Sequence, residues 1–178
     1  TGATAHTDEE YERSVRCGVD MNNPTLYFKG LDVISELGLP LEITEVTVPT
    51  FGDTEEDEEL QADILKLWYS VWFSHSSVNT VVYWNTVDGY AYDSPDSSWL
   101  ENNCRGGLFH HDLTPKKSAL MLKKLFQEIW HTDLELTADK DGYIEFRGFF
   151  GEYIAQVEGK NFDIAVHKNE NNIYELVL

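Results

Sequence analysis

The sequence has few cysteines, few basic residues and no long apolar run. Its 178 residues include two cysteines, Cys17 and Cys104, and neither stands in a CxxC or Cys/His spacing, so we expect no zinc site. The two thiols could pair in an oxidising compartment or stay unpaired, and the sequence leaves both possibilities open. No apolar stretch reaches the length of about 18 residues that predicts a transmembrane helix.

Basic residues are outnumbered by acidic ones. The chain has 13 Lys and Arg against 32 Asp and Glu, a formal charge of -19, which repels phosphate backbones and anionic headgroups. We therefore expect neither nucleic acid nor a membrane surface as a partner. The content of 42% hydrophobic residues is sufficient for one packed core and a small second module, so we expect a globular protein.

An alternation of helices and strands is predicted before residue 131. Residues 22–37 have apolar side chains at helical spacing between Pro24 and Gly38. The β-branched run Leu41–Val48 predicts a strand, and Thr80–Trp84 predicts a second one. Between them, acidic residues 53–59 begin a predicted helix with the apolar stripe Leu60, Ile64, Leu67, Trp68 and Val71. A helix between two strands predicts a parallel crossover.

The remainder divides into a loop, a helix and a tail of short segments. Residues 89–107 predict a long loop, and Pro115 precedes a helix that ends near Trp130. After His131, turn residues separate five predicted strands: Leu134–Leu136, Tyr143–Arg147, Tyr153–Val157, Phe162–His167 and Ile173–Leu178. We therefore divide the chain into residues 1–131 and a small all-β module at 132–178, which packs on the first part or completes a sheet with strands from elsewhere.

Polar and aromatic residues follow the two predicted strands. Two β/α repeats are compatible with a doubly wound sheet or with an eight-stranded barrel. In a barrel, catalytic groups lie at the carboxyl ends of strands; Glu45 lies near the end of the first strand, and Trp84, Asn85 and Asp88 lie at the end of the second. A carboxylate beside flat rings suits a sugar-cleaving cleft, although a strand-end Glu can also be simply solvated or paired with a lysine.

Three ordered blocks resemble family 10 glycoside hydrolases, which are endo-1,4-β-xylanases. Ile43–Val46 resembles the seventh barrel strand, whose Glu is the nucleophile of a retaining mechanism, and Val82–Asp88 resembles the eighth, whose Trp stacks on the cleaved sugar. Gly107–Ala119 resembles the stretch that opens the last barrel helix. The resemblance implies an α/β fold, the carboxy-terminal portion of a (β/α)8 TIM barrel over residues 1–131, followed by the β module.

The resemblance extends to a gut and rumen bacterial branch of this family. That branch has segments similar to Glu56–Glu59, Trp72–His75, Asp88–Ala91 and Phe146–Phe149. Two departures concern specificity: Thr47 stands where many members have Asp, and Gly89-Tyr90-Ala91 replaces Ser-Trp. Trp99, further along the loop, is a candidate for the missing ring.

The resemblance implies a secreted bacterial enzyme that cleaves xylan or xylo-oligosaccharides without a cofactor. Glu45 would attack the anomeric carbon, Trp84 would hold the ring, and Asn85 and Asp88 would support the cleft floor. The family's general acid lies on the fourth strand, which this sequence lacks, so we expect the chain to be inactive alone and its partner to be the amino-terminal portion as a separate or cleaved chain. The start at Thr1, without a signal segment, likewise predicts a removed leader or a cut. The alternatives are a non-catalytic xylan-binding protein and a β-1,4-glucanase.

Three other features have simpler interpretations. His75, His110 and His111 lack metal-ligand spacing, so we expect no metal. Asp139–Gly142 resembles the start of a calcium loop but predicts a hairpin turn, because Phe150 stands where a bidentate Glu is needed. The tail aromatics Tyr143, Phe146, Phe149, Phe150 and Tyr153 could form a sugar-binding face, but their spacing favours a core.

Overall fold

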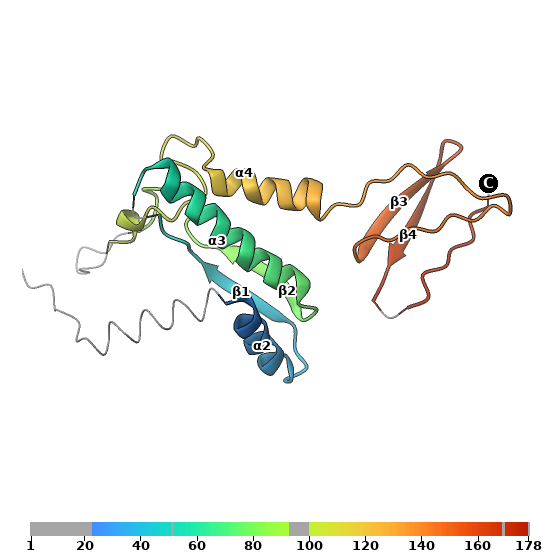
Figure 1. Ribbon diagram of the computed structural model, residues 1–178, viewed down its shortest axis with the longest axis horizontal. Coiled ribbons are helices and arrows are strands. Elements are labelled where there is room, and N and C mark those ends of the chain that lie inside the picture. The colour runs from blue at the N-terminus through green and yellow to red at the C-terminus, as the bar shows by residue number, and fades with distance from the viewer. Residues whose placement is uncertain (1–22, 51, 93–99, 169, 178) are drawn as a thin grey trace, which may run out of the picture. The chain divides into compact units, whose positions relative to one another are not determined.

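The computed structural model describes residues 23–50, 52–92, 100–168 and 170–177 (Figure 1). The chain separates into two compact units, Thr1–Lys123 and Lys124–Leu178. The first contains α2 (Pro24–Ser35), β1 (Leu41–Val46), α3 (Glu55–Ser74), β2 (Val78–Tyr83), the 3-10 helix η1 (Glu101–Cys104) and α4 (Lys117–Lys124, whose last residue begins the second unit). The second contains the π-helical turn η2 (Leu125–Ile129), β3 (Gly151–Val157) and β4 (Lys160–Val166).

The predicted β-α-β crossover is present in the first unit. β1 and β2 pair in parallel, with Leu41 opposite Val78 and Val46 opposite Tyr83. α3 lies along this pair of strands (Figure 1), and its Leu65 and Trp72 are buried together with Val46 and Val48. In the described residues the unit therefore contains a two-stranded parallel sheet with helices and no closed barrel.

Helix α2 begins as the sequence predicts. The side chain of Asn23 accepts hydrogen bonds from the backbone N–H groups of Thr25 and Leu26, at 3.1 and 3.3 Å, and Pro24 occupies the first helical position. The helix contacts α3 through an edge-on Tyr27–Trp72 ring pair, in which the Trp72 indole N–H donates to the Tyr27 hydroxyl at 2.9 Å. A polar contact therefore orients two aromatic groups between the helices.

The predicted apolar stripe of α3 is confirmed only in part. Val71 is buried as predicted, Ile64, Leu67 and Trp68 are half-buried, and Leu60 is 61% exposed. Apolar residues lie on more than one side of this helix, so their spacing alone did not identify the inner face. Gln61 is buried because its side chain is fully hydrogen-bonded, which removes the cost of burying an amide. The buried residues are Gln61, Ala62, Leu65, Tyr69, Val71 and Trp72.

The second unit contains fewer strands than the sequence predicts. β3 and β4 form an antiparallel hairpin with Tyr153 opposite Ile164, but the described residues of 134–136, 143–147 and 173–177 are not in strands. The prediction of a core for the tail aromatics is also wrong, since Tyr143 and Phe150 are 74% and 66% exposed. Two strands cannot enclose a core, and no described side chain after Leu125 is buried. The predicted turn at Asp139–Gly142 is confirmed by the Gly142 N–H, which donates to the Asp139 carbonyl at 3.1 Å.

Candidate functional site

The carboxyl ends of β1 and β2 bring two predicted site residues to one edge of the sheet. Trp84 directly follows β2, and its backbone N–H donates to the Val46 carbonyl at 2.9 Å, which extends the pairing beyond Tyr83. Glu45, the residue before Val46, is exposed, and the Trp84 side chain is 47% exposed. An irregularity in strand register falls between Ile43 and Val46. Such irregularities occur next to active sites, where they redirect a side chain.

Asn85 and Asp88 hold the loop that follows β2. Asn85 has a left-handed backbone conformation with φ 56°, which Asn tolerates better than most residues, and its side-chain amide donates to the Glu101 carboxylate. The Asp88 carboxylate accepts from the Gly107 N–H at 2.8 Å and pairs with the Lys116 ammonium at 2.6 Å. Both Asp88 oxygens are therefore engaged in fixing the loop.

The segment 105–107 is held against the strand ends by several side chains. Besides its contact with Asp88, the buried Lys116 ammonium donates to the Arg105 carbonyl at 2.8 Å. The Tyr83 hydroxyl donates to the Gly106 carbonyl at 2.6 Å, and its burial raises the pKa of the Tyr83 phenol. A side chain at position 106 would meet the Thr47 methyl carbon at 2.4 Å, so this close approach requires Gly106.

A second group of contacts, also not predicted from the sequence, joins α3 and α4. The Gln61 amide donates to the Val48 carbonyl at 2.7 Å and to the Gly107 carbonyl at 3.2 Å, and its oxygen accepts from the Ser118 hydroxyl at 2.9 Å. Gln61 and Ser118 are almost completely buried. The sequence gave no signal that Gln61 is buried, because Gln61 lies within a predicted helix and two of its partners, Gly107 and Ser118, are more than 40 positions away in the chain.

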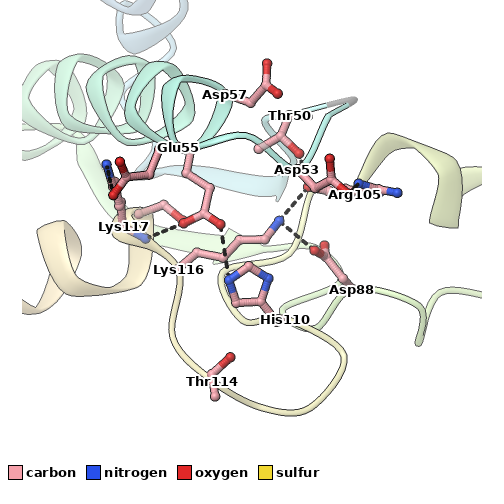
Figure 2. Close-up of polar contacts among 12 residues, drawn as sticks. Thr50, Asp53, Glu55, Asp57, Asp88, Arg105, His110, Thr114, Lys116 and Lys117 are labelled. Atoms are coloured by element: carbon pink, nitrogen blue, oxygen red, sulfur yellow. Dashed lines mark hydrogen bonds and ion pairs between the residues drawn. The ribbon is translucent and has the colours of Figure 1, made fainter.

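An open pocket of about 640 Å³ lies beside the Asp88–Lys116 pair, between the start of α3 and the loops after β2. Figure 2 shows two ion pairs around it, Arg105 with Asp53 at 2.9 Å and Lys116 with Asp88. A third pair joins His110 and Glu58 at 3.1 Å. Neither Glu45 nor Trp84 lines this pocket.

Two of the three histidines named above contact one carboxylate each, whereas His111 lies against the Tyr90 ring. His110 pairs with Glu58, and the buried His75 pairs with Asp32 at 3.3 Å. Over residues 23–50, 52–92, 100–168 and 170–177, no group of three or more His, Cys, Asp or Glu side chains could hold a metal ion. Trp99 and Cys17 lie outside the described residues, so the predictions for the loop ring and the thiol pair are untested, while Cys104 is buried.

Comparison with known proteins gives one relative in sequence. No family model matches the chain. The chain is 28% identical over 152 residues to the anti-sigma-I factor RsgI6 of Acetivibrio thermocellus, a match that covers 85% of this chain and 17% of that protein. The chain therefore spans a small part of the length of this relative.

Among the described residues, no helix is long and apolar enough to cross a membrane.

Two xylanase structures share part of the fold. Xylanase 10B from Thermotoga petrophila, solved with xylobiose, matches with a TM-score of 0.51 and 22% identity over 60% of this chain and 32% of its own. Native xylanase 10B from Thermotoga maritima matches with a TM-score of 0.51 and 21% identity, over 60% of this chain and 33% of its own. The chain is thus a mixed α/β structure similar to part of the family 10 xylanase fold, in agreement with the sequence resemblance.

Proposed function

We propose that this chain forms part of a cleft of the family 10 glycoside hydrolase type, and that the cleft binds β-1,4-linked xylan without hydrolysing it. The observation that carries the proposal is the position of Trp84, half exposed at the strand-end edge beside the exposed Glu45. A flat indole packs against the apolar face of a pyranose ring, and a neighbouring carboxylate accepts hydrogen bonds from its hydroxyl groups.

The similarity to a protein named as an anti-sigma-I factor favours binding over hydrolysis. Such a protein needs a ligand-dependent signal rather than turnover. A cleft that holds xylan without consuming it would keep the signal present for as long as the polysaccharide is present. We therefore propose polysaccharide sensing as the role of the binding cleft.

Retaining hydrolysis is the second candidate function, and the strand-end position of Glu45 favours it. A retaining glycosidase needs a second carboxyl group about 5–5.5 Å from the nucleophile. We propose that the amino-terminal portion of the barrel, as a further segment of the protein or as a cleaved chain, would have to supply it. In that case Glu45 is the nucleophile, Trp84 and Trp99 contact the sugar, and Asn85 and Asp88 position the loop.

Domain organisation and location complete the proposal. We propose that residues 1–131 are the carboxy-terminal part of the barrel domain, that residues 132–178 are a separate β module, and that a bacterium secretes the protein. We propose a β-1,4-glucan as the competing ligand class, because most of the subsites that discriminate between such ligands in the family lie on other parts of the barrel.

The test uses the natural protein, meaning the complete polypeptide that its source organism makes. Titration calorimetry with xylohexaose measures binding, and a reducing-sugar assay on xylan measures hydrolysis. We expect Trp84→Ala to weaken binding at least tenfold through the loss of one stacking ring. The matched control is Phe73→Ala, because Phe73 is 48% exposed on α3 and lies away from the strand ends in sequence.

The two candidate functions give different results in this test. Binding without release of reducing sugar supports the sensing role. Hydrolysis that disappears in Glu45→Gln, with xylohexaose binding retained, supports the retaining enzyme instead. Equal affinities of the wild type and Trp84→Ala for xylohexaose would contradict both.

A further inference from the structure

The open pocket beside the Asp88–Lys116 pair has the size of a small-molecule site. Its volume of about 640 Å³ falls within the range of about 300–1,000 Å³ that is typical of ligand pockets. Residues from the start of α3 and from the loops after β2 line it, whereas Glu45 and Trp84 do not. Asp88 and Gly89 belong to its lining, so the pocket adjoins the strand-end edge of the proposed function without including Glu45 or Trp84.

An aromatic pair is already formed at this pocket. The ring centroids of Tyr90 and His111 lie 5.2 Å apart with an interplanar angle of 39°, and His111 lines the pocket. Gly89 makes the approach possible, because its φ of +82° suits glycine and an added Cβ would lie 2.7 Å from the His111 ring. Tyr90 does not line the pocket itself but is 63% exposed beside His111, so the two tilted rings offer an accessible aromatic surface at the pocket edge.

The carboxylates around the pocket are all held by polar partners. Each acidic side chain in the lining has a hydrogen-bonded or ion-paired partner at 3.1 Å or less: Asp53 with Arg105, Glu58 with His110, Asp88 with Lys116, and Asp112 with the Thr114 hydroxyl. The lining has more carboxylates than cations, which does not favour phosphate, and the described residues contain no group of three or more His, Cys, Asp or Glu side chains that could hold a metal ion. Paired polar groups beside a flat ring suit a neutral ligand with many hydroxyl groups.

We propose that this pocket is a second carbohydrate-binding site, at which a pyranose unit of a β-1,4-linked xylan chain lies against the Tyr90 and His111 rings. The identity of the ligand rests on the proposed function, whereas the location rests on the pocket itself. A second contact on the same chain of sugars raises the effective affinity for a polymer more than for a short oligosaccharide.

The experiment follows both sites separately in the natural protein. Histidine and tryptophan side chains are labelled, and NMR spectra are recorded during titration with xylotetraose. We expect the His111 ring resonance to move in the wild type and in Trp84→Ala, while that of His75, which is 4% exposed, stays in place. The titration of the His111 resonance gives the affinity for xylotetraose at this pocket. In the Trp84→Ala background, Tyr90→Ala should lower that affinity about tenfold, whereas Tyr92→Ala, at an 84% exposed position, should change it by no more than about twofold.

The outcomes separate this inference from the proposed function. A His111 resonance that stays in place at saturating xylotetraose overturns the second site, as does a Tyr90→Ala protein with unchanged affinity. If His111 responds but the Trp84 indole resonance does not, the second site stands and the strand-end proposal fails. If Trp84 alone responds, the strand-end proposal stands and the second site is refuted.

Discussion

Removal of the Lys116 ammonium should release the loop segment 105–107 from the strand ends. Lys116 is 2% exposed, and its ammonium contacts the Asp88 carboxylate at 2.6 Å and the Arg105 carbonyl at 2.8 Å. The substitution Lys116→Met keeps an unbranched apolar stem as far as Cε but deletes the ammonium group. Asp88, 13% exposed, is then left with the Gly107 N–H as its remaining described partner.

Breaking a buried ion pair by removing one partner costs about 3–5 kcal/mol. We take the lower end, about 3 kcal/mol, because Asp88 retains some contact with solvent and keeps one hydrogen bond. If the substitution lowers the free energy of local opening of the loop by this amount, the amide hydrogen of Gly107 should exchange with solvent about 100-fold faster.

Hydrogen–deuterium exchange of the natural protein measures this rate at the Gly107 amide, which donates to Asp88. The control is Lys117→Met at the next position, since Lys117 forms its ion pairs with Glu55 and Glu59 at exposed sites, where such pairs stabilise little. We expect the Lys117 variant to leave the Gly107 exchange rate nearly unchanged. Exchange rates that agree within about threefold between Lys116→Met and the wild type would refute the assignment of a stabilising role to this pair.

Three further predictions follow from other contacts. Gln61→Leu should destabilise the first unit by about 2 kcal/mol, measured by urea unfolding, because it leaves the Ser118 hydroxyl and the Val48 and Gly107 carbonyls without their partner; Gln127→Leu, at an exposed site, should not. Thr114→Val should raise the pKa of Asp112 towards the ordinary value of 3.8 in an NMR titration, because the Thr114 hydroxyl and N–H lower that pKa. The pKa of Asp112 is depressed in the folded state. The stability from this contact is therefore present above pH 3.8 and is lost as the pH falls through the lowered pKa. Asn23→Ala should cost about 1 kcal/mol of α2 stability and speed exchange of the Thr25 and Leu26 amides, whereas Asn23→Ser should retain most of the cap; an unchanged rate in the Ala variant would contradict the capping role.

The elements of the first unit could be predicted because local signals agree with the fold. Pro24 and Gly38 bound α2, the acidic first turn and the Thr54 cap begin α3, and β-branched runs mark both strands. The parallel pairing followed from the helix between the strands. The placement of Glu45 and Trp84 at one edge follows from the same rule, since parallel strands end on the same side.

The side chains that hold the site could not be predicted, because they act through distant partners. Lys116 contacts Asp88 from 28 positions away, and Gln61 contacts Ser118 from 57 positions away. A lysine after a proline and a glutamine in a helix have no periodic pattern that marks them as buried. The inner face of α3 was predicted only in part for the same reason, as the burial of Gln61 depends on carbonyls supplied by other segments.

The tail shows where alternation of apolar residues is insufficient. Five predicted strands share the same alternating pattern, but pairing is found for β3 and β4 in the described residues. The outer edge of β4 is occupied by side chains instead: the Tyr174 hydroxyl bonds with the N–H and carbonyl of Ala165, and the Asn172 amide does so with those of His167. The segment around Tyr174 therefore contacts β4 through side chains, and the strand predicted there is not formed.

The most direct test of the xylan-binding claim is a crystal structure of the natural protein soaked in xylohexaose. The proposal predicts a pyranose ring packed about 4 Å above the Trp84 indole, with its hydroxyl groups close to the Glu45 carboxylate. A structure in which the strand-end edge stays empty at saturating xylohexaose, or in which the sugar contacts neither Trp84 nor Glu45, would contradict it.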